Sequence, residues 1–319
     1  AVACFSAGMA NNVLLLVFAV FLLRQAGQGL ATHTSLTAIL KHFGDHKGKA
    51  LALTGVGFPL GRAILPITAI FFITSIGWQE TYILCGFLVL VCMVPATLIL
   101  VNPKPTIAPN KLNEGLPSDE LLKDGSSVTL KKALRAPLFY LLMPGFLVPS
   151  FLDTALAFHV LLVAHLKQWP AELVLSGYGV YAALSIIASV CAGPILDKFG
   201  TRKLLNYSLV PSVFGLVVLM YLENPLWVFV YLGLFGAVSG LRMTLIPFTL
   251  SDIYGTKHIA SIRSFVAALS VFASALGPPV LGLFLDFNFT ITKICTIYIM
   301  YLIPSILLTM LATRFYMGS

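Results

Sequence analysis

Long apolar runs recur along the chain, and each is bounded by only a few polar residues. A helix that crosses the roughly 30 Å hydrocarbon core of a bilayer needs about 20 apolar residues. The residues AVILMFWYC make up 58% of the 319 positions and DEKR only 10%, too little charge to cover a water-facing surface. We therefore predict an all-α polytopic membrane protein. The expected spans are residues 13–40, 49–75, 79–101, 137–166, 172–195, 204–222, 226–252, 260–285 and 292–314, after a shorter run at 1–10.

One extended polar segment, residues 102–135, interrupts these runs. It is rich in Pro, Gly, Ser and charge, as linkers are. We expect residues 1–101 to be the remainder of an N-terminal transmembrane half, 102–135 a cytoplasmic linker, and 136–319 a C-terminal half of six helices. No Met precedes Ala1 and the opening run is about half a span long, so we expect the first two to three helices to be incomplete.

The basic residues lie mostly in alternate loops. Of the 20 Lys and Arg residues, 15 fall in one set of loops and the tail, whereas the opposite set holds only Lys167 and Lys293. By the positive-inside rule the richer set is cytoplasmic. The net charge of +8 then reports orientation, and no nucleic-acid partner is needed to explain it. We expect a multi-pass protein of the plasma (cell inner) membrane.

A weak internal repeat relates the two halves. A shift of 211 residues aligns 27–50 with 238–261, pairing Gly29 with Gly240 and Gly44 with Gly255. Both copies enter a short basic loop and return through a helix that contains Gly and Pro. Duplicated helical halves around a central site are typical of secondary transporters.

The loop GPILDKFGTRKLL at 193–205 fits the pattern G-x-x-x-D-x-x-G-x-[RK]-[RK]. RQAGQG (24–29) and the Gly- and Pro-rich stretches at 48–66 and 273–282 are further familiar patterns. On these motifs the chain resembles the major facilitator superfamily, in its monocarboxylate-transporter-like branch, over helices three to twelve of twelve. The resemblance implies two pseudo-symmetric six-helix halves, a monomer, and a conformational role for the loop motif. The matching loop residues are Gly193, Asp197, Gly200, Arg202 and Lys203.

The basic residue that monocarboxylate transporters carry in their eighth helix has no counterpart at 172–195, where Glu172 is the only charged residue. The resemblance is accordingly stronger for the superfamily than for the branch.

Three basic residues lie within the predicted spans. A charge at the bilayer centre costs about 2.5–3.5 kcal/mol on insertion scales, so it needs a partner or a water-filled cavity. The repeat places Arg24 and Arg242 on equivalent helix faces, and Gln28 shares the face of Arg24. We predict substrate binding by Arg242, Arg24, Arg62 and Gln28. The alternatives are a structural ion pair for Arg242 and a gate or an interhelical anchor for Arg62.

Asp153 is the only acidic residue in the middle of a span. It either neutralises an arginine or carries a coupled proton. His159 is a second candidate for a proton path, and its alternative is a hydrogen-bonded packing role.

We expect a secondary transporter of a small organic solute, either a proton symporter or a facilitative carrier. An organic anion such as a monocarboxylate is favoured by three mid-span cations against one acid. Its partners are then the substrate, protons and the lipid bilayer. No HExxH pattern occurs, so we expect no enzyme, no metal and no cofactor. The alternatives are a non-transporting sensor and a transporter of a neutral or drug-like solute.

Overall fold

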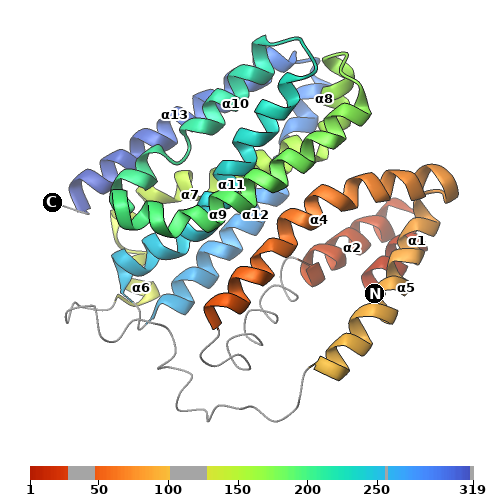
Figure 1. The fold of residues 1–319 in the computed structure, drawn as a ribbon, viewed down its shortest axis with the longest axis horizontal. Helices are drawn as coiled ribbons and strands as arrows, with labels where there is room; N and C mark the ends of the chain where they lie inside the picture. The colour runs from red at the N-terminus through yellow and green to blue at the C-terminus, as the bar shows by residue number, and fades with distance from the viewer. Residues whose placement is uncertain (28–46, 101–127, 256–257, 317–319) are drawn as a thin grey trace. The chain divides into compact units, whose positions relative to one another are not determined.

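The computed structural model describes residues 1–27, 47–100, 128–255 and 258–316, which are helical with short turns and contain no β-strand (Figure 1). The chain forms two compact units, Ala1–Leu121 and Leu122–Ser319. Each unit is described by itself.

The first unit is a small group of apolar helices. α1 packs on α2 and α5, and α4 packs on α5. Asn12 starts α2 because its side-chain Oδ1 accepts a hydrogen bond from the Leu15 N–H at 2.8 Å, an N-cap that satisfies a free donor of the first turn. The helices are α1 (Val2–Gly8), α2 (Val13–Arg24), α4 (Lys47–Ile76) and α5 (Trp78–Leu100).

The second unit is a bundle in which the long helices α7, α9, α11, α12 and α13 lie side by side (Figure 1). α9 packs along α11, α7 along α12 and α13, and α10 along α11 and α13. The helices are α6 (Leu130–Ala133), α7 (Pro137–Phe158), α8 (Val160–Leu166), α9 (Ala171–Tyr207), α10 (Val210–Tyr221), α11 (Trp227–Tyr254), α12 (Ile259–Asp286) and α13 (Ile291–Tyr316).

Seven helices among the described residues are long and apolar enough to cross a membrane: α4, α5, α7, α9, α11, α12 and α13. α2 and α10 are shorter and equally apolar. The prediction of an all-α polytopic protein is confirmed, because apolar runs of this length have no other stable environment.

Three predicted boundaries differ from the structure. The span expected at 204–222 is divided at Ser208 and Leu209, because α9 continues to Tyr207 and α10 begins at Val210. The span expected at 137–166 is divided at His159, where the backbone leaves helical geometry (φ −101°, ψ 14°). The apolar pattern continues across this residue and therefore hides the break. The loop expected at 197–203 is helical on both sides of Gly200, and the turn is made by Gly200 alone (φ 76°, ψ 154°). Only glycine adopts this conformation readily, so one residue replaces a loop.

The closest helix pair in the bundle is α9 with α11. A Cβ atom on Gly236 would collide with the backbone carbonyl of Tyr181, and one on Gly240 with that of Ser185. The two glycines are four residues apart on one face of α11, as are Tyr181 and Ser185 on α9. Absent side chains thus let the two backbones touch, as expected for a GxxxG face in a membrane helix.

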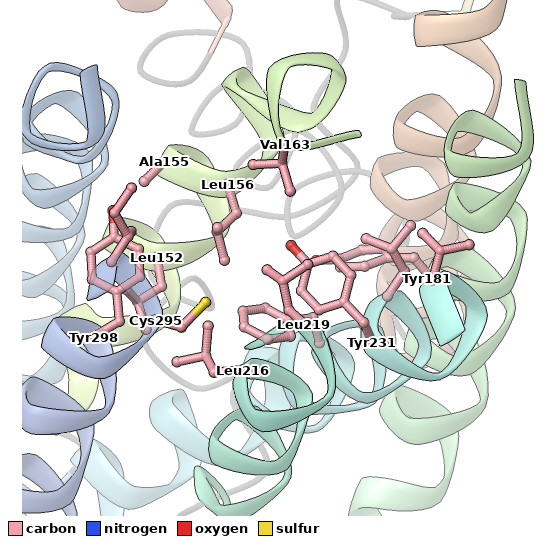
Figure 2. Close-up of a cluster of buried hydrophobic side chains, with 14 of the residues drawn as sticks. Leu152, Ala155, Leu156, Val163, Tyr181, Leu216, Leu219, Tyr231, Cys295 and Tyr298 are labelled. Atoms are coloured by element: carbon pink, nitrogen blue, oxygen red, sulfur yellow. The ribbon is translucent and has the colours of Figure 1, made fainter. Parts of the chain in front are cut away.

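The rest of the bundle is filled by two apolar clusters. One joins α7 to α9, α10, α11 and α13, and Figure 2 shows Tyr181 at one end of it and Tyr298 at the other. The second lies around the first half of α7 and includes Leu138, Phe146 and Leu250. Polar groups that lie within these clusters need partners there, because burial of an unpaired polar group is costly.

The α9–α11 contact gives a stability prediction. Gly240→Ala should destabilise the protein by about 1–3 kcal/mol, because the new methyl group meets backbone that cannot give way. Gly179→Ala on α9 is the matched control, since no described atom lies within 4 Å of its Cβ position and alanine favours a helix. Thermal unfolding in detergent should show a lower midpoint for the first variant only. Equal unfolding midpoints for the two variants would contradict close backbone contact in the α9–α11 seam, the face formed by Gly236 and Gly240 against Tyr181 and Ser185.

Candidate functional site

Arg242 is a cation buried inside the second unit. Its side chain is 3% exposed. Nη1 donates to the Ser208 hydroxyl oxygen and Nη2 to the Gly145 carbonyl oxygen, each at 2.5 Å. Nε is buried and has no hydrogen-bond partner among the described residues. The partners of this guanidinium within the described chain are therefore neutral.

Proline explains why the Gly145 carbonyl needs such a donor. In an α-helix a carbonyl accepts from the N–H four residues later, and the residue four after Gly145 is Pro149, which has no N–H. An unpaired carbonyl in an apolar interior is costly, and the Arg242 guanidinium supplies the missing donor. The carbonyl oxygen that Pro149 leaves without a helical donor is thus the one that accepts from Arg242.

Ser208 completes the contact on the other side. Its hydroxyl donates to the Leu205 carbonyl at 2.9 Å while its oxygen accepts from Arg242. Arg242 therefore ties α11 to α7 and to the turn between α9 and α10. Among the described residues it is an interhelical anchor with a hydroxyl and a carbonyl as partners. The alternative of a structural ion pair stays a prediction. A substrate anion at this position would use Nε or displace one of these partners.

Asp153 lies on the same helix as Gly145, eight residues later, which is about 12 Å along an α-helix. It is half-buried, and Oδ2 accepts a hydrogen bond from the Tyr181 hydroxyl at 3.1 Å. The neighbouring Thr154 donates to the Ser274 hydroxyl at 3.2 Å on α12. The structure thus places the carboxylate between α7 and α9, and no described contact joins it to Arg242.

His159 stands at the break between α7 and α8. Its ring Nδ1 lies 3.1 Å from the Ala155 carbonyl oxygen, so Nδ1 carries a hydrogen and donates it. The Ala155 carbonyl oxygen also accepts a hydrogen bond from the backbone N–H of His159 at 3.3 Å. The described hydrogen bonds of His159 are with its own helix, and its Nε2 lies 3.7 Å from the Cβ position of Gly282 on α12. Its role in a proton path stays a prediction.

The other two cations belong to the first unit. Arg24 is the last residue of α2, and Arg62 lies in α4 between Pro59 and Pro66. Both side chains are half-buried and both make interactions. Gln28 lies outside the described residues. Substrate binding by these three residues stays a prediction.

The loop motif surrounds the turn at Gly200. Asp197 and Lys203 are exposed, and Gly193 and Arg202 are partly exposed. No described atom approaches a Cβ position on Gly200 within 4 Å, so glycine is needed for its positive φ and not for space. Gly255, at the end of α11, has a similar backbone (φ 74°, ψ 177°). Its repeat partner Gly44 lies outside the described residues.

Two residues of this arrangement are missing from the sequence-based predictions: Tyr181 and Ser208. The sequence carries a signal for the Gly145 carbonyl, because Pro149 leaves it without a helical donor, but none for Ser208. Which side chain reaches that carbonyl is set by the packing of four helices. For Tyr181 there is no local signal, since tyrosine in an apolar run is ordinary.

The family model of the Major Facilitator Superfamily matches residues 1–278 and 177–318, which together cover nearly the whole chain. The chain belongs to the Major Facilitator Superfamily. It is a multi-pass integral membrane protein of the all-α fold of that superfamily, as its motifs and apolar helices predict.

Among curated relatives of the superfamily, monocarboxylate transporter 1 of Bos taurus is 25% identical over 317 residues, covering 87% of this chain and 62% of its own length. An MFS-type transporter of Gibberella moniliformis is 24% identical, with 80% and 59% covered. Monocarboxylate transporter 12 of Mus musculus is 25% identical, with 82% and 58% covered. These similarities support the predicted monocarboxylate-transporter-like branch. The chain spans about three fifths of the length of these relatives.

The Arg242 contact predicts a measurable coupling. Arg242→Met should destabilise the protein by about 1–3 kcal/mol, because the Gly145 carbonyl is left buried without a donor. Adding Pro149→Ala provides an N–H four residues after Gly145, so the double variant should recover part of the loss. Unfolding midpoints of the single and double variants measure this interaction as a double-mutant cycle.

Pro144→Ala is the matched control for the cycle, since its N–H would serve the Tyr140 carbonyl and not that of Gly145. Strict additivity of Pro149→Ala with Arg242→Met would show that the guanidinium does not replace the missing helical donor.

Proposed function

We propose that this protein is a secondary transporter of the plasma membrane that moves a small organic anion, such as a monocarboxylate, by alternating access and in symport with protons. The observation that carries the proposal is the excess of cations within the apolar spans, Arg24, Arg62 and Arg242 against Asp153. Intramembrane charges are costly and are kept where they serve a substrate or ion path.

The relatives support the substrate class. Two of them are named monocarboxylate transporters, and the third is named only as an MFS-type transporter. In transporters built from repeats, substrate sites lie near the bilayer midplane where the repeats meet. We assign anion binding to Arg24 and Arg62, whose side chains are only half-buried, with Gln28 as a polar neighbour.

Arg242 has a different place in this proposal. Two of its five N–H donors are already used by Ser208 and Gly145, which leaves Nε–H and one N–H on each Nη for an anion. Its positive charge still lowers the cost of bringing an anion into the bundle, since charges interact over several ångströms in a medium of low dielectric constant.

Asp153 is the proposed proton carrier. It is half-buried in a membrane helix and hydrogen-bonded to Tyr181, so its protonation changes both the charge and the hydrogen bonding between α7 and α9. His159, one turn and a half further along, is the second candidate on the proton path.

The proposed organisation is an N-terminal half at 1–101, a linker at 102–135 and a C-terminal half at 136–319, working as a monomer. The boundary between the two compact units, after Leu121, falls inside that linker and supports this division. The loop motif Gly193, Asp197, Gly200, Arg202 and Lys203 would serve as a conformational latch, for which the sharp turn at Gly200 is suited.

A transporter of a neutral solute is the second candidate. It is favoured by the engagement of Arg242 and by the absence of any basic residue in 172–195.

Uptake into proteoliposomes that hold the full-length protein separates these candidates. With an inward proton gradient we expect accumulation of labelled carboxylates and not of neutral sugars. Arg24→Ala and Arg62→Ala should each reduce uptake about tenfold or more, the loss expected for a hydrogen bond between charged groups. Arg314→Gln, in the last turn of α13, is the control cation and should leave uptake unchanged. Uptake of neutral solutes alone would reject the anion.

The coupling role of Asp153 has its own test. Asp153→Asn should abolish accumulation driven by the proton gradient while leaving exchange of substrate across the membrane, because the amide cannot carry a proton through the cycle. Counterflow and gradient-driven uptake are measured on the same vesicles. Accumulation that survives the substitution would remove Asp153 from the proton path.

A further inference from the structure

The hydroxyl of Tyr181 joins α9 to the carboxylate of Asp153 on α7. Tyr181 is 2% exposed, so its ring is inside the bundle, whereas Asp153 is half-buried. The hydrogen bond therefore connects a fixed donor of the core to a carboxylate at the edge of that core.

Packing holds the Tyr181 ring in place. The ring of Tyr178, one turn earlier on α9, lies 6.1 Å away between centroids at a tilt of 51°. Behind the residue, Gly236 of α11 presses against the Tyr181 backbone so closely that no side chain fits there. Figure 2 shows the ring at the end of the apolar cluster that joins four helices to α7. The position of the hydroxyl is thus set by the α9–α11 seam.

The strength of this hydrogen bond depends on the charge of Asp153. A hydroxyl that donates to an ionised carboxylate makes a bond about twice as strong as one between neutral groups. When the carboxyl is protonated, the attraction falls to that of a neutral pair. The contact between α7 and α9 at this point is therefore stronger when Asp153 is ionised.

Asp153 lies in the part of α7 between Pro149 and the end of the helix at His159. Pro149 removes one hydrogen bond of the helix four residues before it, and the helical backbone ends at His159. On its other side the segment stays attached to α12 through Thr154 and Ser274, and through Gly277 against the Phe151 carbonyl. A change in the hydrogen bond to Tyr181 therefore acts on the last part of α7, between Pro149 and His159.

We propose that Tyr181 is the positioning residue of Asp153: its hydroxyl stabilises the ionised carboxylate, and protonation of Asp153 loosens α7 from α9. This inference rests on the proposed function, in which Asp153 carries the proton. An uncharged residue, Tyr181, then sets the pH at which Asp153 takes up the proton.

Other titratable groups surround α7 and enter the design of the test. α12 contributes the Ser274 hydroxyl, and its charged residues Arg263 and Asp286 lie towards its ends. Histidine is the titratable side chain that ordinarily changes charge between pH 5 and 8. Measurements in a His159→Gln background therefore separate the titration of this histidine from that of Asp153. Titratable groups on the packed helices include Tyr178 (α9), Tyr231 and Arg242 (α11), Cys295, Tyr298 and Tyr301 (α13), His159 (end of α7) and His165 (α8).

The test is a pH titration of the Asp153 carboxyl by infrared difference spectroscopy on the purified full-length protein, with Asp153→Asn to identify the carbonyl band. In Tyr181→Phe the midpoint should move to higher pH by about one to two units, the loss of a hydrogen bond to a charged group. Tyr298→Phe is the matched control, because its buried hydroxyl has no hydrogen-bond partner among the described residues. Its midpoint should equal that of the wild type.

A second variant reaches the same bond from behind. Gly236→Ala pushes on the Tyr181 backbone and should also raise the midpoint, whereas Gly240→Ala pushes on Ser185 one turn away and should raise it less. An unchanged midpoint in Tyr181→Phe overturns the inference even if Asp153→Asn abolishes coupled uptake. A raised midpoint supports it even if Asp153→Asn leaves gradient-driven uptake intact, an outcome that would instead reject the coupling role of Asp153.

Discussion

A backbone carbonyl without a donor costs several kcal/mol inside a membrane, where no water can replace the missing hydrogen bond. Every one of the seven membrane-length helices carries at least one interior proline and so frees such a carbonyl. At Pro149 the structure shows how the cost is met: the Arg242 guanidinium crosses from α11 to the Gly145 carbonyl. The same contact gives a buried cation neutral partners. One interaction thus solves two problems of burial and fixes how α7, α11 and the α9–α10 turn meet.

The seam between α9 and α11 has a different physical basis. Gly236 and Gly240 contribute nothing but the absence of side chains, and the gain is close contact between backbones. Water is not squeezed out when two apolar helices meet in lipid, so packing of this kind has to supply the attraction. The seam also has a chemical consequence, because it fixes Tyr181, whose hydroxyl points at Asp153. Packing on one face of α9 and polar contact on another are therefore linked through a single residue.

Arg242 and Asp153, the charged residues in the middle of the second unit's predicted spans, have separate surroundings on separate helices. Arg242 lies in the bundle interior with two of its five N–H donors on neutral partners, whereas Asp153 lies half-buried at the edge of an apolar cluster with a hydroxyl as a described partner. This difference suits an anchor and a proton carrier respectively, since a group that exchanges protons needs a route to water and an anchor does not. Both contacts lie on α7, which loses a backbone hydrogen bond at Pro149 and ends at His159.

The sequence by itself determined the class of protein, because apolar runs of about 20 residues with few charges have one stable environment, and the loop around Gly200 with its matched motif identified the superfamily. It also located the charged residues within the spans, since such residues are rare there. Only the tertiary structure decided what those residues touch. Apolar periodicity does not show that a helix ends at His159, that Tyr181 reaches Asp153, or that Arg242 serves the carbonyl freed by Pro149. These contacts join residues 28 and 97 positions apart in the chain, and their geometry follows from how whole helices pack, which no local pattern records.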